Sequence, residues 1–129
     1  MYLHAVCRVG TVADPGDTVI AVPDNVPYYL VGLQAARLRN ASGPEKMARN
    51  LLDSEAEFLV TTPMQRRRYR KNTIATAVKK SPEQFELVAG RFPVRAYRIL
   101  PPGEEPDPNL RSPGAASPRC SELLPKGRP

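Results

Sequence analysis

Short segments in which apolar and polar residues alternate predict most of the strands. The first of them has apolar residues at a period of two, namely Leu3, Ala5, Cys7 and Val9. We therefore expect a strand over residues 2–9. The β-branched run 18–22 is expected to pair back on it, after a turn at residues 14–17 in which Pro and Gly suit the two central positions.

Three later segments predict further strands. They are residues 57–62, 73–78 and 93–100, and each contains β-branched or aromatic residues between turn signals. The last one changes its alternation near Ala96, which indicates a slip or a bulge. Residues 81–88 have two interpretations, a short capped helix or a turn that leads into a strand, and we favour the turn.

Two segments have the apolar spacing of amphipathic helices. The first is expected from residue 24 or 25 to about Asn40, with Gly32 at a point of close packing. The second begins at residues 42–45, whose Ser and Glu have the spacing of a capping box, and ends near residue 53 or 54. These elements predict an α+β fold with a small, mostly antiparallel β body and two helices.

The C-terminal part has a different composition. Residues 101–129 contain 8 of the 15 prolines and few large apolar side chains, so this segment is not expected to bury enough surface to fold. We expect a body over residues 1–100, followed by an extended Pro-rich C-terminal arm over residues 101–129. The candidate anchors of this arm on a neighbouring subunit are Leu110, Leu123 and Leu124, and a free tail without function is the alternative.

The overall composition is ordinary for one small globular domain. The 129 residues are 41% apolar and 25% charged, without a run long enough for a membrane span or the pattern of a secretory signal.

Cys7 and Cys120 are far apart in unlike contexts, so we expect free thiols in a reducing compartment, the first buried and the second accessible. With His4 as the one histidine, the chain is not expected to bind a metal or another cofactor.

The charge of +6 is carried by the body. Residues 1–100 hold 15 Lys and Arg against 9 Asp and Glu, whereas the arm holds 4 of each. Five positive charges lie within six residues in one basic strip, which consists of Arg66, Arg67, Arg68, Tyr69, Arg70 and Lys71. Such a strip, in a loop or a short helical turn, can bind nucleic acid without regard to sequence, dock on an acidic protein face or remain a solvated loop.

The residues do not form a recognisable catalytic motif. The chain has no Gly-rich phosphate loop and no nucleophile elbow, and His4 lacks a nearby acid–base partner in the sequence. Glu55 and Glu57 are a candidate carboxylate pair, although a solvated helix end is the commoner arrangement. We therefore expect a protein that is not an enzyme, with His4 at the surface.

Residues 7–38 resemble small proteins of tailed bacteriophages. The resemblance is carried by a short first strand, a Pro-Gly-Asp turn at residues 15–17, a second strand that ends at Pro23, and a helix with a Gly and small residues over 29–36. It implies a structural or assembly component of the virion at the capsid, neck or tail, made in the host cytoplasm. Its implied partners are other virion proteins in a symmetric multi-copy assembly, with nucleic acid as a further candidate and no membrane. A nucleic-acid-binding protein and a small host-directed phage inhibitor are the alternatives.

Overall fold

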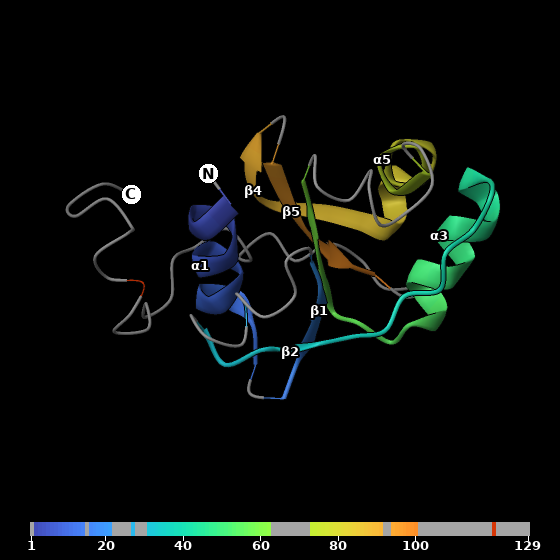
Figure 1. The fold of residues 1–129 in the computed structure, drawn as a ribbon. Coiled ribbons are helices and arrows are strands. Elements are labelled where there is room, and N and C mark those ends of the chain that lie inside the picture. The colour runs from blue at the N-terminus through green and yellow to red at the C-terminus, as the bar shows by residue number, and fades with distance from the viewer. Residues whose placement is uncertain are drawn as a thin grey trace.

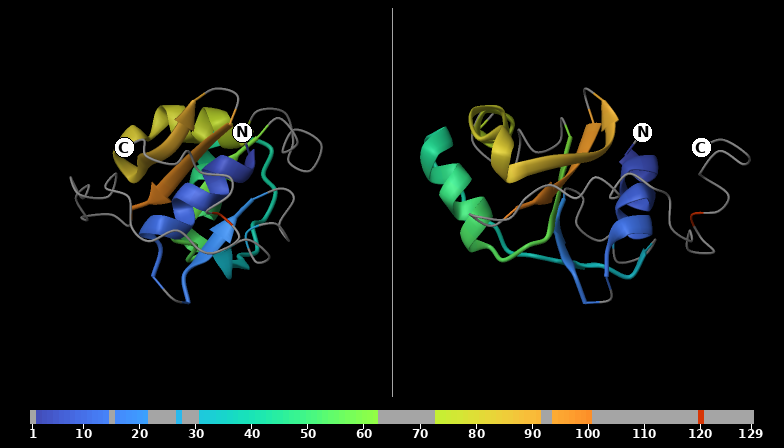
Figure 2. Two further views of the ribbon diagram at one scale, coloured as in Figure 1. Left: turned by 90° about the vertical axis from the view of Figure 1, so that its left-hand side faces the viewer. Right: turned by 180° about the vertical axis from the view of Figure 1, so that it is seen from behind.

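The body of the protein is a mixed five-stranded sheet with helices on both faces (Figures 1 and 2). The structure is a computed structural model, and it describes residues 2–14, 16–21, 27, 31–62, 73–91, 94–100 and 120. The described helices are α1 (Tyr2–Val12), α3 (Pro44–Asp53), α5 (Thr73–Lys80) and the 3-10 helix η1 (Pro82–Gln84). The described strands are β1 (Thr18–Ile20), β2 (Gln34–Ala35), β3 (Phe58–Thr61), β4 (Phe85–Arg91) and β5 (Val94–Ile99).

The strands follow the order β2-β1-β3-β5-β4. Both neighbours of β1 run parallel to it, whereas the pairs β3–β5 and β5–β4 are antiparallel. The fold is therefore α+β, as expected, but the sheet is mixed rather than mostly antiparallel. β1 pairs with β2 and β3 and not with residues 2–9, because those residues form a helix.

Alternation along the central strands divides the core into two parts. Ile20, Leu59 and Tyr97 face α3 and α5, where they pack with Met47 and Leu51 among others. The side chains next to them in sequence face α1, and these include Val19, Phe58, Val60 and Ala96. Because both faces are covered, the central strands are apolar on both sides. Figure 1 shows α1 on one side of the sheet and α3 and α5 on the other.

The two largest corrections concern segments that were expected to be strands. Residues 2–12 form α1, and residues 73–80 form α5. The buried residues are Ala5, Val6, Cys7 and Val9 in α1, and Ile74, Ala77 and Val78 in α5. In α1 the expected strand pattern fails at Leu3, whose exposed fraction is 41%, and at Val6, which is buried although it lies off the period-two positions. The described residues therefore contain three α-helices, where two were expected.

The expected helix over residues 24–40 is wrong in its second half. Gly32 has φ +74, and residues 34–35 form β2. Only glycine adopts this φ readily, and a Cβ at Gly32 would meet no atom within 4 Å. Gly32 therefore serves a change of chain direction and not close packing. Pro27 and Val31 are helical, in agreement with the first half of the expected helix, and its residues 24–26 and 28–30 lie outside the described residues.

Other local predictions are confirmed, with differences in detail. α3 ends at Asp53 as expected, but its N-cap is Gly43, without a side-chain capping bond. A 3-10 turn precedes β4, as favoured, and β3 and β5 lie where expected. The bulge is also present, but β4 carries the extra residue, between Leu87 and Ala89. Among the described helices, none has the length and apolar content needed to cross a bilayer.

Candidate functional site

Helix α1 is held against the sheet by small residues. Ala5 and Val9 pack on the apolar side chains of β3, β4 and β5. Gly10 allows an unusually close approach, because a Cβ at this position would lie 2.4 Å from Cγ1 of Val31. The helix is thus fixed at both its sheet-facing side and its contact with residue 31.

A disulfide joins α1 to the C-terminal region. Cys7 and Cys120 are bonded, with their Cα atoms 5.6 Å apart and a sequence separation of 113 residues. Their exposed fractions are 1% and 0%, and they pack with Val6. The burial of Cys7 is confirmed, whereas the expected free thiols and the accessible Cys120 are wrong. Neither the spacing nor the local sequence contains a signal for this pairing.

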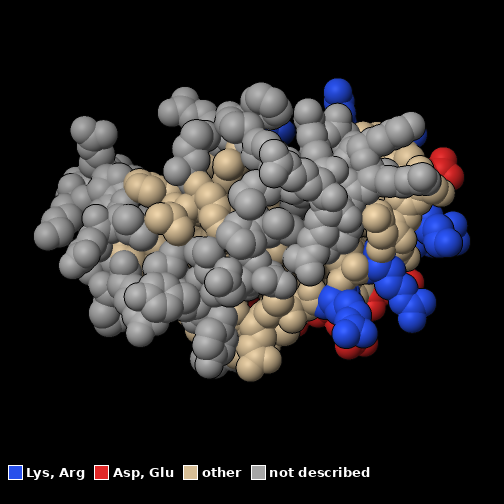
Figure 3. Space-filling view, in the orientation of Figure 1, with Lys and Arg blue, Asp and Glu red and all other residues tan. Residues whose placement is uncertain are grey.

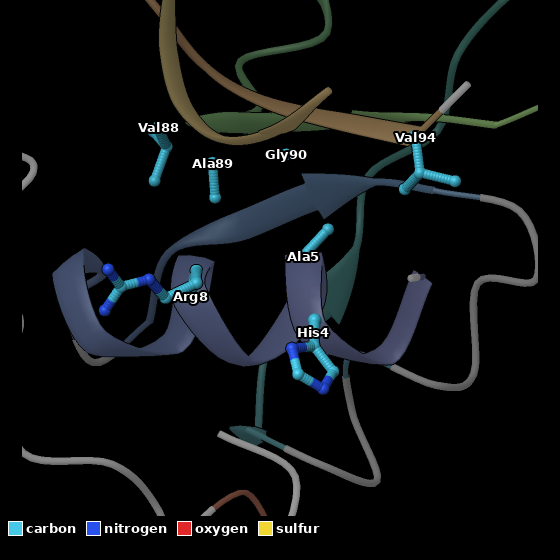
Figure 4. Close-up of a pocket in the computed structure, with 7 residues that line it drawn as sticks. All are labelled: His4, Ala5, Arg8, Val88, Ala89, Gly90 and Val94. Carbon is cyan, nitrogen blue, oxygen red and sulfur yellow. The ribbon is translucent and has the colours of Figure 1, made fainter. Parts of the chain in front are cut away.

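A pocket of about 470 Å³ lies between α1 and the end of the β4–β5 hairpin (Figure 4). It is lined by His4, Ala5, Arg8, Val88, Ala89, Gly90 and Val94. The bulge directs both Val88 and Ala89 toward α1, and the alanine leaves space there. Gly90 has φ +88, and a Cβ at this position would lie 2.4 Å from the carbonyl oxygen of Val94, so a side chain is excluded there.

The polar part of this pocket comes from α1. His4 and Arg8 are four residues apart and therefore lie on one side of the helix. His4 is exposed, which confirms its expected place at the surface, although it lies on a helix. Arg8 is half-buried, and no carboxylate of the described residues forms an ion pair with its guanidinium. The pocket thus combines an apolar wall with a cation that has no counter-ion in the described part of the chain.

Three carboxylates, those of Asp14, Asp17 and Glu57, lie near one another at the start of β1. The turn at residues 14–17 is confirmed, since the Asp17 N–H donates to the Asp14 carbonyl at 3.1 Å and Gly16 has φ +91. Glu57 accepts hydrogen bonds from the N–H of Thr18 at 2.6 Å and from its hydroxyl at 3.1 Å. Burial raises the pKa of Asp17, and the charges of Glu57 and Asp14 add to this rise, against the lowering by the Asp14 N–H.

These carboxylates have a structural use. Glu57 ties β3 to β1, while Glu55 is exposed in the preceding turn with φ 61, so the candidate carboxylate pair is not assembled. Within the described ranges, no three His, Cys, Asp or Glu side chains gather in a way that holds a metal ion.

Exposed cations gather on the opposite side of the molecule. In the view of Figure 3, most of the visible Lys and Arg side chains lie on the side where Figure 1 places α3, with a few acidic side chains among them, and others lie at the top of the view. The exposed basic residues on or beside α3 and α5 are Arg37, Arg39, Lys46, Arg49, Lys79 and Lys80. The basic strip 66–71 lies outside the described residues, as do Leu110, Leu123 and Leu124.

Sequence reasoning missed the pocket because it depends on α1 being a helix. Tyr2, Val6 and Val9 have the i, i+4, i+7 spacing of one helix face, and this spacing was the available signal for a helix. In such a helix His4 and Arg8, four residues apart, lie on one side. No protein-family model matches the chain, and no curated protein or solved structure matches it either.

Proposed function

We propose that the protein is a non-enzymatic assembly component of a tailed-bacteriophage particle, at the capsid, neck or tail, that acts through contacts with other virion proteins. The observation that carries the proposal is the buried Cys7–Cys120 disulfide. Disulfides persist in oxidising surroundings, including virion surfaces, and are rare in the cytosol. A chain made in the host cytoplasm would therefore form this bond on its way to, or within, the released particle.

The C-terminal arm is the second part of the proposal. Its anchors Leu110, Leu123 and Leu124 contact neighbouring subunits in a symmetric multi-copy assembly. Because Cys120 is bonded to α1, the arm is attached to the body at this residue; Leu110 precedes the attachment in the chain, and Leu123 and Leu124 follow it.

The resemblance to phage proteins supports this setting through one segment. The Pro-Gly-Asp turn and the strand after it agree with β1 and the Asp14–Asp17 turn. Two parts of the resembled unit do not agree: its first strand, because residues 2–12 form α1, and the end of its helix, because residues 34–35 form β2. The disulfide therefore carries more of the proposal than the resemblance does.

The test is mass spectrometry of purified particles, digested without reduction. The proposal expects the protein at a fixed copy number and a cross-linked peptide pair that contains Cys7 and Cys120. An abundant host cytosolic protein serves as the control for contamination. Absence from the particle, or a copy number that varies with the preparation, rejects the function, and a particle-bound protein with free thiols rejects the role of the disulfide.

A second candidate function is sequence-independent binding of nucleic acid by the strip Arg66–Lys71. It is favoured by the exposed Lys79 and Lys80 at the end of α5, the helix that follows the strip in the chain. Binding to any duplex at about 50 mM salt should weaken steeply as salt rises, and serine at the five basic strip positions should flatten that slope. Arg8→Gln, on the other face, is the matched control and should leave the slope unchanged. Undetectable binding at low salt rejects this candidate.

A further inference from the structure

Strand β4 is the outermost strand at one end of the sheet. It pairs with β5 on one side, and no described residue pairs with its other side. An edge strand presents backbone N–H and C=O groups that an extended segment of another protein can bind as an additional strand. The seven residues of β4 make it much longer than β2, the strand at the opposite edge.

The pocket lies where such an added strand would place a side chain. Side chains of a strand alternate between the two faces of the sheet, so every second side chain of an added strand faces α1. Val88 and Ala89 face α1 next to this edge, and His4, Ala5 and Arg8 line the pocket from α1. In Figure 4, Ala5 points toward the strands, whereas the ring of His4 lies on the side of α1 away from them. A side chain that enters the pocket from the edge therefore has both apolar residues and Arg8 among its neighbours.

The charges of the pocket select the chemistry of that side chain. Arg8 is half-buried without an ion-pair partner among the described residues, and a carboxylate matches the two parallel N–H groups of a guanidinium. No acidic side chain lines the pocket in the described chain.

We propose that β4 and the pocket beside it form a docking site for an extended segment of a partner protein, which adds as a strand to β4 and places an Asp or Glu side chain against Arg8. The proposal rests on the proposed function, because it names the kind of contact through which the protein assembles. Strand addition supplies affinity through main-chain hydrogen bonds, and the pocket supplies the preference for an acidic segment.

The test uses defined peptides and the full oxidised chain. The probe is acetyl-Thr-Val-Glu-Val-Thr-amide, and the comparison peptides carry Lys in place of Glu or N-methylated backbone amides. Binding is followed by NMR titration of the backbone amides. We expect shifts in β4 and α1, with the Glu peptide bound about tenfold more tightly than the Lys peptide, as expected for a charge-assisted hydrogen bond.

Two variants and two further probes decide the outcome. Arg8→Gln should remove the preference for Glu, while Arg95→Gln should keep it, since Arg95 is exposed and faces the α3 side between the α1-facing Val94 and Ala96. An unchanged preference in Arg8→Gln overturns the proposal. Equal binding of the N-methylated peptide, or of butyrate alone, also overturns it, in favour of a small carboxylate ligand. If the peptides do not bind as expected, the docking proposal fails while the assignment to the phage particle still stands. If the protein is absent from particles, the assignment fails while the peptide-binding result still stands.

Discussion

The two faces of the sheet are covered in different ways. On one face, α3 and α5 bury large side chains, among them Met47, Leu51 and Tyr97. On the other face, α1 packs mainly through Ala5 and Val9 and is cross-linked to Cys120. On the first face the helices contribute large side chains, whereas on the other face α1 contributes small ones against Phe58 and the other apolar residues of the sheet, together with a covalent bond and the pocket. The difference indicates that the α1 face, which leaves space for a ligand, depends most on the cross-link.

The strongest test of this comparison is removal of the disulfide. We expect the double variant Cys7→Ala/Cys120→Ala to lose about 4 kcal/mol of unfolding free energy, because the bond closes a loop of 113 residues. Chemical denaturation measures the loss, and hydrogen exchange should show α1 losing protection before α3 does.

Reduction of the natural chain provides the control for this variant. A thiol reductant should lower the stability of the natural chain by a similar amount and leave the double variant unchanged. If reductant does not change the melting of the natural chain, the α1 face is held by packing alone and the comparison fails.

The second test concerns the face covered by α3 and α5. Leu51 is fully buried, so Leu51→Ala should lower the free energy of unfolding by about 3 kcal/mol, through lost burial and the cavity left behind. The matched control is Leu3→Ala on α1, where the exposed fraction of 41% predicts a change within about 0.5 kcal/mol. Equal losses at the two positions would mean that α1 does not present Leu3 to solvent.

The third test concerns the close approach of α1 to residue 31. Alanine is favoured over glycine by about 1 kcal/mol inside a helix, but a Cβ at Gly10 would lie 2.4 Å from Val31. Overpacking costs about 1–3 kcal/mol, so Gly10→Ala should destabilise by about 1 kcal/mol. In a Val31→Ala background the same substitution should become neutral or stabilising. If Gly10→Ala stabilises the natural chain, this contact is absent.

The same comparison separates what the sequence predicts from what it does not. β1, β3, α3 and β5 were found because their apolar spacing and turn residues agree on one structure. α1 and α5 were missed because short segments of Val, Thr and Ile favour strands locally, while tertiary packing decides in favour of helices. The pocket and the disulfide both depend on α1, so they were not predictable once that helix was taken for a strand.

The smallest expected effect concerns Asp17, at the turn between α1 and β1. Its pKa is raised by burial and by the charges of Glu57 and Asp14, so the folded state binds a proton at Asp17 more tightly than the unfolded state. The contribution of this residue to stability is therefore fully present below the unfolded pKa of 3.8 and is lost as pH rises through the raised folded pKa.

Asp17→Asn removes that charge and keeps an oxygen to accept the hydrogen bond of the Asp14 N–H, which is 2.9 Å long. We expect a gain of a few tenths of a kcal/mol at pH 7, because solvent screens much of the repulsion at this turn. The gain should disappear below about pH 4, where the natural aspartate is protonated as well, and it should shrink in high salt. Thermal melts of both chains from pH 3 to pH 8 measure it. A gain that persists at pH 3 would show that the substitution acts through the turn backbone and not through charge.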